Sequence, residues 1–343
     1  MTQQTQYQAA MQRALELALL GPVHGPNPQV GAVILDRSHQ IIAEGWHRGA
    51  GTPHAEVVAL SQLAVIPDGC TAVVTLEPCN HTGRTGPCAH ALIDAGISRV
   101  VYASSDPGRE SAGGAQRLRE AGVEVIANFD AAAADRQLNV WLTAMRNQRP
   151  FVTLKWAASL DGRAAAEDGT SQWISGPESR AHAHLLRSQV DAILVGTATA
   201  SVDRATLTAR QADGTLYPDQ PLRVVLGERD LPADLPVFNG DAPSLQLKTR
   251  DPHTALAELW KREVRHLLIE GGPQVASAFV QAGLVDQFLL YQAPMLLGGP
   301  RVAVADLGIH NISQAKSLKF ESVQHLGADL LITAVPTPPE SEH

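Results

Sequence analysis

From residue 53 the chain reads Pro53-His54-Ala55-Glu56-Val57, and Pro78-Cys79 and Cys88 follow further along. One imidazole and two thiolates suit Zn²⁺, and three protein ligands leave a fourth position for water, as in catalytic zinc sites. Glu56 need not bind the metal, so it is free to carry protons as the catalytic residue. The sequence therefore predicts a zinc ion held by His54, Cys79 and Cys88.

This order of residues is typical of zinc-dependent deaminases, in which the Glu acts as general acid and base. Two alternatives remain open. A structural zinc would need a fourth protein ligand, for which His81 and His90 are the nearby candidates. A zinc-stabilised protein without catalysis would not need Glu56.

The third cysteine, Cys70, opens an apolar run and is predicted to be an inert core thiol.

The length of 343 residues is about twice that of a typical domain, and 44% hydrophobic residues can fill two cores. We predict domains at residues 1–147 and 150–335, followed by a disordered tail at 336–343.

The formal charge of −8 argues against a nucleic-acid surface, which needs a basic face, and thus against a tRNA deaminase. The chain has no apolar run long enough for a membrane span and no apolar signal core near Met1. Three cysteines fit a reducing compartment. We therefore expect a cytoplasmic protein.

The first half alternates between the apolar patterns of helices and strands. Helices are predicted at residues 7–20, 54–65, 87–95, 113–121 and 131–147, and strands at 30–35, 40–46, 71–76, 99–103 and 123–126. Such alternation indicates a layered α/β sheet.

The second half begins with an apolar strand from Phe151 that contains Lys155. A lysine inside a buried strand calls for an anionic partner, whereas the alternative is an edge-strand lysine that faces water. A buried strand is predicted at 191–196, a polar loop at 203–210, and helices at 178–189 and 274–282. Gly271-Gly272-Pro273 precedes the last helix and could cradle a phosphate, although G-x-G-x-x-G is absent.

The first half resembles the deaminase domain of the RibD family, whose members are bifunctional riboflavin-biosynthesis enzymes. The matching stretches are Pro26-Asn27-Pro28-Gln29-Val30-Gly31, Gly45-Trp46-His47, Pro53-His54-Ala55-Glu56-Val57 and the continuous run at residues 74–88. The run contains the spacing of eight residues between Cys79 and Cys88 that separates this family from deaminases with P-C-x-x-C. The loop Gly108-Arg109-Glu110 departs from the family pattern.

The second half resembles the reductase domain of the same family, which is similar in fold to dihydrofolate reductase and uses NADPH. The matching stretches are Lys155-x-Ala157-x-Ser159-Leu160-Asp161-Gly162, Ser171-Gln172-Trp173-Ile174, Asp203-x-x-x-Leu207-Thr208-x-Arg210, Glu270-Gly271-Gly272-Pro273 and Ala293-Pro294-x-Leu296-Leu297-Gly298-Gly299. The resemblance implies two three-layer α/β domains, the first cytidine-deaminase-like and the second dihydrofolate-reductase-like.

Residue by residue, the resemblance implies contacts with the cofactor by Ala158, Trp173, Thr199, Asp203 and Gly272. It implies contacts with the substrate by Ser171, Leu207, Arg210 and Glu270. Lys155 joins the substrate group because a phosphorylated ligand needs cations. The family commonly has Asp-Asp-Pro where this chain has Asp203-Arg204-Ala205.

The implied substrates are phosphorylated pyrimidines. The first domain would deaminate 2,5-diamino-6-ribosylamino-4(3H)-pyrimidinone 5′-phosphate, and the second would reduce the ribosyl side chain to ribityl with NADPH, giving 5-amino-6-ribitylamino-uracil 5′-phosphate. The alternative, in which the second half is a binding or regulatory module, predicts no NADPH binding. No nucleic-acid or membrane partner is expected, and a homo-oligomer is left open.

Overall fold

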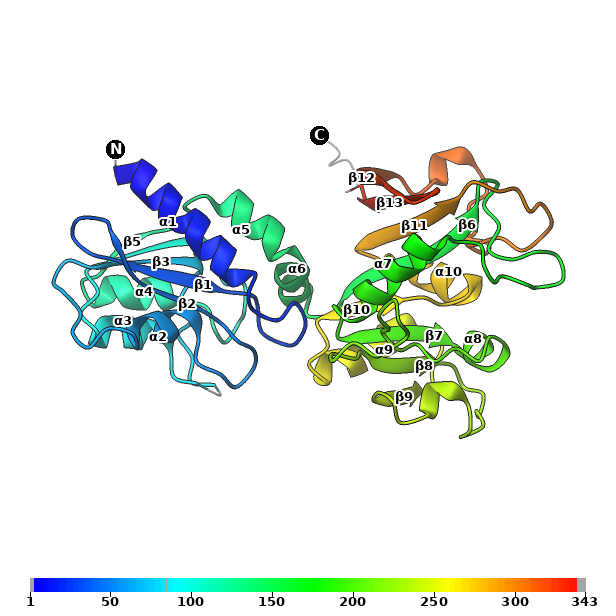
Figure 1. The fold of residues 1–343 in the computed structure, drawn as a ribbon, viewed down its shortest axis with the longest axis horizontal. Helices are drawn as coiled ribbons and strands as arrows, with labels where there is room; N and C mark the ends of the chain where they lie inside the picture. Colours follow the sequence, from blue (N-terminus) through cyan, green and yellow to red (C-terminus); the bar gives the residue numbers. More distant parts are fainter. Residues whose placement is uncertain (1–2, 84, 338–343) are drawn as a thin grey trace. The chain divides into compact units, whose positions relative to one another are not determined.

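A computed structural model describes residues 3–83 and 85–337 of the chain. The chain divides into two compact units, residues 1–148 and 149–343 (Figure 1). The division lies between Gln148 and Arg149, and each unit has its own sheet and hydrophobic clusters. The two units are therefore described separately.

The first unit is built on a five-stranded sheet of order β2-β1-β3-β4-β5. β1 pairs antiparallel with β2 and β3, whereas β3, β4 and β5 are parallel. The strands are β1 (Gly31–Leu35), β2 (Ile41–Trp46), β3 (Thr71–Leu76), β4 (Arg99–Ser104) and β5 (Glu124–Ile126).

Helices cover both faces of this sheet and make a three-layer unit (Figure 1). Alternate residues of β1 point to opposite faces: Val33 packs with α1, and Ile34 packs in the cluster of α2 and α3. The helices are α1 (Gln3–Ala18) and α5 (Ala131–Gln137) on one face, and α2 (Ala55–Leu60), α3 (Cys88–Asp94), α4 (Gly114–Glu120) and α6 (Asn139–Asn147) with the other cluster.

The single helix predicted at residues 131–147 is wrong, because the segment forms two helices. Leu138 between them has φ −92° and ψ 5°, outside the helical region. Ala134 of α5 packs in the cluster of α1, whereas Leu138 and Leu142 pack in the cluster on the opposite face. The break lets one segment serve both faces of the sheet.

The second unit is built on an eight-stranded sheet of order β12-β13-β11-β6-β10-β7-β8-β9. The strands from β11 to β9 in this order are parallel, and β13 and β12 add an antiparallel edge. The strands are β6 (Phe151–Ser159), β7 (Ala192–Gly196), β8 (Leu222–Leu226), β9 (Ser244–Leu247), β10 (His266–Ile269), β11 (Gln287–Ala293), β12 (Leu318–Leu326) and β13 (Asp329–Pro336).

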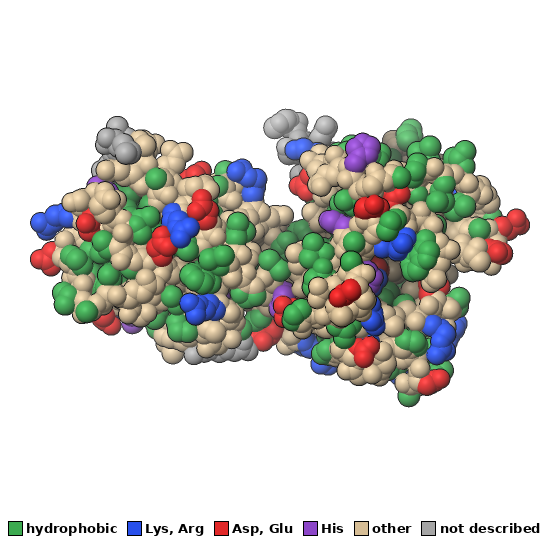
Figure 2. All heavy atoms as spheres, viewed as in Figure 1, with side chains coloured by type: hydrophobic (Ala, Val, Ile, Leu, Met, Phe, Trp, Pro, Cys, Tyr) green, Lys and Arg blue, Asp and Glu red, His purple; other side chains and the backbone are tan. Residues whose placement is uncertain are grey.

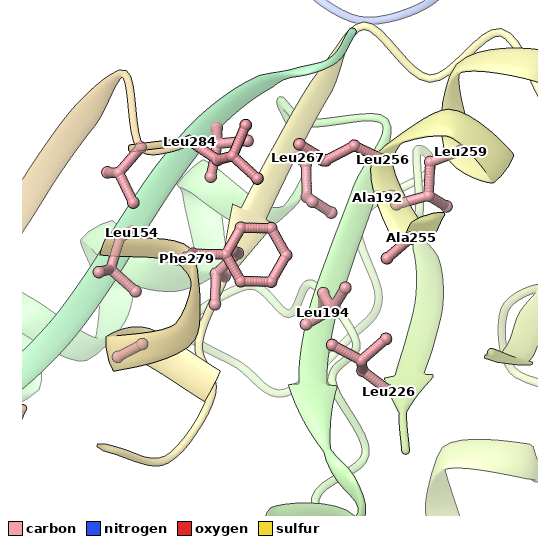
Figure 3. Packing of buried hydrophobic residues seen from close by; sticks show 14 of the residues in the cluster. Leu154, Ala192, Leu194, Leu226, Ala255, Leu256, Leu259, Leu267, Phe279 and Leu284 are labelled. Atoms are coloured by element: carbon pink, nitrogen blue, oxygen red, sulfur yellow. The ribbon is translucent and has the colours of Figure 1, made fainter. Parts of the chain in front are cut away.

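Helices lie on both faces of this sheet as well. Figure 3 shows Phe279 of α10 among Leu154, Leu267 and other apolar side chains of the sheet, with α9 contributing Leu256 and Leu259. Burying one such side chain contributes about 1.5–3 kcal/mol. The helices are α9 (Pro252–Lys261) and α10 (Pro273–Gln281) on this face, and α7 (Pro177–Arg187) and α8 (Thr197–Val202) in the clusters of the other, with short 3₁₀ turns at Pro236–Phe238 and Ile312–Gln314.

Strand β6 lies inside the sheet between β11 and β10. The alternative of an edge-strand Lys155 is therefore wrong. The carboxyl ends of the parallel strands β6, β7 and β10 meet at one edge of the sheet, where α/β proteins bind their ligands. Ala158, Thr197 and Glu270 stand at or just after these strand ends.

On the face shown in Figure 2, basic and acidic side chains are interspersed over both units. Across residues 3–83 and 85–337, no helix has the length and apolar character that crossing a membrane requires. Of the predicted tail, Pro336 is the last residue of β13, and residues 338–343 lie outside the described part of the chain.

Candidate active sites

His54, Cys79 and Cys88 lie together in the first unit. Nδ1 of His54 is 3.2 Å from Sγ of Cys88 and 3.5 Å from Sγ of Cys79. A nitrogen and a sulfur bound to one tetrahedral zinc are about 3.6 Å apart, so the three donor atoms fit this ion. Among the residues that the structure describes, the metal-binding group comprises these three and excludes His81 and His90.

Close packing of α2 on β2 brings His54 to this position. His54 is the residue that caps the N-terminus of α2, with extended backbone angles. A Cβ atom at Gly45 of β2 would overlap the α2 backbone at Ala55 and Ala59, so only glycine permits this approach. The ring of His47, just after β2, meets the His54 ring edge to face at a centroid distance of 5.2 Å.

The other nitrogen of His54 has a partner of its own. Nε2 lies 3.1 Å from Oγ1 of Thr85. With zinc on Nδ1, Nε2 would carry the hydrogen and donate it to Oγ1 of Thr85. Such a second contact fixes the orientation of a metal-binding imidazole.

The surroundings of Cys79 favour its thiolate form. Hydrogen bonding from the Cys88 thiol, and then from His54, lowers the pKa of Cys79 to about 4. The backbone N–H of Cys88, the first residue of α3, also donates to Cys79 Sγ at 3.4 Å. Because zinc binds thiolate rather than thiol, these contacts favour the form of Cys79 that the metal needs.

Glu56 lies in the first turn of α2, two residues after His54, and is 3% exposed. Burial raises the pKa of the Glu56 carboxyl above its ordinary value. A carboxyl with a raised pKa exchanges protons more readily near neutral pH. Glu56 is thus suited to proton transfer next to the three donor atoms.

Glu77 connects the cysteine loop to the loop after β4. Its carboxylate accepts the N–H of Ala115 at 3.0 Å and that of Asp106 at 3.4 Å. Gly108, in the stretch that departs from the family pattern, is buried, and a Cβ there would overlap Oγ of Ser111. The altered loop is therefore closely packed around residue 108.

A buried cluster of charges occupies the second unit. Glu270 accepts two hydrogen bonds from Arg187, at 2.8 and 2.9 Å, and lies 3.5 Å from Nζ of Lys155. Burial alone would raise the pKa of Glu270, but Arg187 and then Lys155 stabilise the carboxylate and hold its pKa well below the ordinary range. The anionic partner expected for Lys155 is thus Glu270.

Arg187 also connects Glu270 with the 203–210 loop. Its Nη1 donates to the carbonyl oxygen of Thr208 at 3.1 Å. Leu207 is buried, and Arg210 is one-third exposed, with its guanidinium 3.7 Å from the carboxylate of Asp241. Sequence reasoning missed Arg187, because it stands in an amphipathic helix without a motif around it.

The residues predicted at the cofactor lie mostly near the carboxyl edge of the sheet. Ala158 is buried in β6, and Thr199 lies in α8. Gly272 caps the N-terminus of α10, where a Cβ would come within 3.5 Å of Oγ1 of Thr199. Asp203 ends α8 and is exposed.

Ser171 and Trp173 lie on the exposed segment between β6 and α7. Trp173 is 67% exposed, and the Arg180 guanidinium stands 4.6 Å from its ring centroid. Across the described residues, neither side chain is hydrogen-bonded to the Lys155–Glu270 pair.

Comparison with known proteins relates both units to described families. Residues 150–332 match the RibD C-terminal domain, and residues 4–104 match the cytidine and deoxycytidylate deaminase zinc-binding region. The chain belongs to the RibD family. It is accordingly a bifunctional riboflavin-biosynthesis enzyme with a deaminase domain and a reductase domain.

Individual RibD proteins resemble the chain over nearly its whole length. The riboflavin biosynthesis protein RibD of Mycobacterium tuberculosis is 47% identical over 90% of this chain and 91% of its own length. That of Escherichia coli is 37% identical over 95% of this chain and 98% of its own length. The structure of Acinetobacter baumannii RibD matches with a TM-score of 0.90 at 37% identity, covering 98% of this chain and 100% of that one.

A fourth relative carries both activities in its name. It is a diaminohydroxyphosphoribosylaminopyrimidine deaminase/5-amino-6-(5-phosphoribosylamino)uracil reductase from Thermotoga maritima. Its structure matches with a TM-score of 0.84 at 30% identity, covering 98% of this chain and 100% of that chain. The three-layer α/β architecture expected for both RibD domains is confirmed by these matches and by the two sheets.

Exchange of one cysteine tests the metal site. Changes to residues that contact a metal ligand typically lower metal affinity about 10–100-fold. We expect Cys79→Ser to lower zinc affinity by more than this, because a hydroxyl replaces a thiolate ligand. Cys70→Ser is the matched control, since Cys70 is equally buried but lies outside the metal-binding group. Zinc content per chain, measured by atomic emission, should fall in the first variant alone. Equal zinc loss in both would contradict this ligand set.

Proposed function

We propose that the first domain deaminates 2,5-diamino-6-ribosylamino-4(3H)-pyrimidinone 5′-phosphate to the corresponding aminouracil. This proposal rests on one observation. The donor atoms of His54, Cys79 and Cys88 lie close enough together to bind one zinc ion, and Glu56 is buried beside them. When bound, zinc activates a water molecule for attack on the amine-bearing ring carbon.

Four side chains then have assigned roles in the deamination. His54, with Nδ1 toward the two sulfurs and Nε2 on Thr85, would hold the metal in a fixed direction together with Cys79 and Cys88. Glu56 would take a proton from the attacking water and deliver it to the nitrogen that leaves as ammonia. Burial favours this exchange because it raises the pKa of Glu56 above its ordinary value.

We propose that the second domain reduces the deaminated product. NADPH would supply a hydride to C1′ of the sugar, the C1′–O4′ ring bond would open and O4′ would take a proton, so that ribosylamino becomes ribitylamino. Two features support a dinucleotide here. Gly271 and Gly272 precede the N-terminus of α10, where side chains would obstruct a ligand, and Thr199 lies beside Gly272. Ala158, Trp173 and Asp203 complete the proposed cofactor contacts.

The substrate would lie near the Lys155–Glu270–Arg187 cluster. Glu270 is held as a carboxylate, so it can accept hydrogen bonds from substrate hydroxyl groups. Lys155 and Arg210 would supply positive charge for the phosphate, Lys155 as a point charge and Arg210 through its planar guanidinium. Ser171 and Leu207 complete the proposed substrate contacts.

One assay tests both activities. The purified chain is given the diaminopyrimidine phosphate with and without NADPH, and each product is identified by mass. We expect the aminouracil alone without NADPH and the ribityl compound with it. Deamination without any NADPH-dependent product would favour the alternative of a binding or regulatory module.

Arg210→Ala tests the phosphate contact. We expect KM for the phosphorylated substrate to rise about 10–100-fold, since a charge-assisted hydrogen bond contributes about 1.5–3 kcal/mol. KM for NADPH should change little. Arg250→Ala is a control in the same domain. Arg250 is exposed, and within the described part of the chain its ion pair is with Glu228. Equal increases in both KM values would remove Arg210 from the substrate site.

We also propose that both reactions take place in the cytoplasm. The three cysteines are free thiols in the structure, and the proposed zinc site needs two of them reduced.

A further inference from the structure

Side chains from outside the 203–210 loop hold it in place. Gln220 makes a two-point contact with Ala209: Oε1 accepts the Ala209 N–H at 2.9 Å, and Nε2 donates to the Ala209 carbonyl oxygen at 2.8 Å. The same Nε2 donates to the carbonyl of Tyr217 at 2.8 Å. Because Ala209 is fully buried, these bonds satisfy main-chain groups that water does not reach.

Arg223 on β8 is the second anchor. Its side chain is fully buried, and its guanidinium donates to the carbonyl oxygens of Thr206 at 3.1 Å and Pro236 at 3.3 Å, and to Oδ1 of Asn239 at 2.9 Å. The guanidinium also donates to the carbonyl oxygen of Ala242, so all four of these acceptors are uncharged oxygens. Its buried guanidinium connects the loop at Thr206 with the segment that follows β8.

The loop needs such anchors because its backbone is unfavourable by itself. Arg204 has φ 46° and Leu207 has φ 58°, in the left-handed region that residues with side chains rarely occupy. Conformations of this kind persist where the surrounding structure imposes them. Arg223 binds Thr206, just before Leu207, and Gln220 binds Ala209, two residues after it. These contacts hold the backbone of Leu207 in its left-handed conformation.

We propose that Gln220, together with Arg223, is a positioning residue of the reductase that sets Leu207 and Arg210 for the pyrimidine phosphate. This inference rests on the proposed reductase function. The anchors hold residues 206 and 209, whereas Asp203, assigned to the cofactor, stands at the end of α8 on the far side of Arg204. The effect is therefore on substrate binding rather than on NADPH binding.

Gln220→Leu in the full chain tests this role. We expect KM for the aminouracil phosphate to rise about tenfold, as for loss of a hydrogen-bonded loop anchor, with KM for NADPH changed less than about twofold. The matched control is Gln281→Leu, because Gln281 also ties its amide to a main-chain carbonyl, that of Asp306, at the distal end of α10. A purely structural effect would lower the active fraction, and thus the maximal rate, without changing KM.

Arg223→Lys is the second variant, because it keeps the charge but has fewer directed donors. We expect KM for the aminouracil phosphate to rise less in Arg223→Lys than in Gln220→Leu. If Gln220→Leu does not fold, Arg223→Lys alone tests the proposal. An unchanged substrate KM in both variants, an equal rise in KM for NADPH, or the same rise in Gln281→Leu would overturn the proposal. A parent chain that does not oxidise NADPH would refute the proposed reductase function, and the positioning role with it.

Discussion

Glu56→Gln is expected to retain its zinc and to lose deamination by about 100–10,000-fold, the range that a positioned proton-transfer group contributes. The amide has nearly the same volume as the carboxyl and fits the same buried site in the first turn of α2. It has no titratable proton, so water cannot be deprotonated and ammonia cannot be protonated on leaving. Initial rates of ammonia release and zinc content, measured on one preparation, check this expectation.

Glu120→Gln is the matched control for this experiment, because it makes the same exchange on an exposed position of α4. Its deamination rate should equal that of the parent chain. If Glu56→Gln deaminates at the parent rate with zinc in place, the assignment of Glu56 as the proton carrier is wrong. If zinc is lost as well, the buried carboxyl has a role in holding the site together.

Glu270→Gln should produce the largest change in the second domain. Removing one partner of a buried charge cluster costs about 3–5 kcal/mol, because the cations of Lys155 and Arg187 lose the carboxylate that compensates them. We therefore expect reduction to fall at least about 100-fold and the thermal unfolding of this domain to shift downward. Deamination in the same tube should persist.

The pH dependence of stability has a defined sign at Glu270. The folded protein lowers the pKa of this carboxyl from its ordinary value of 4.5, so its contribution is complete above that pH and is lost as the pH falls below it. Glu270→Gln should therefore flatten acid unfolding of the reductase domain below about pH 4.5. The control Glu258→Gln removes surface pairs with Lys261 and Arg262 and should leave both activities and the acid profile unchanged.

The residues of the metal site could be predicted because they stand in short motifs. His54 and Glu56 are two positions apart, and Cys79 and Cys88 flank one loop, so ligand type and spacing are both visible in the sequence. Arg187 could not be found in this way. Its partner Glu270 is 83 residues further along, and only the fold brings α7 over the end of β10.

Parts of the fold escaped prediction for a related reason. Strand β12 is exposed along most of its length, and a register shift between Phe320 and Ser322 interrupts the alternation of its apolar and polar side chains, so its pairing with β13 depends on tertiary contacts. The sequence predicts no helix between the strand at 191–196 and the polar loop at 203–210, but Thr197–Val202 form the short helix α8. Its β-branched threonines are modest helix formers, but buried Ala200 anchors it against the sheet.

The division of the chain at Gln148 and Arg149 has a genetic consequence. Each half builds its own sheet and its own core, so a lesion confined to one half leaves the other folded. A cell with one allele damaged only in the metal site and a second damaged only around Lys155 still holds one intact copy of each catalyst. The two alleles are then expected to complement each other, with the intermediate diffusing from one polypeptide to the next.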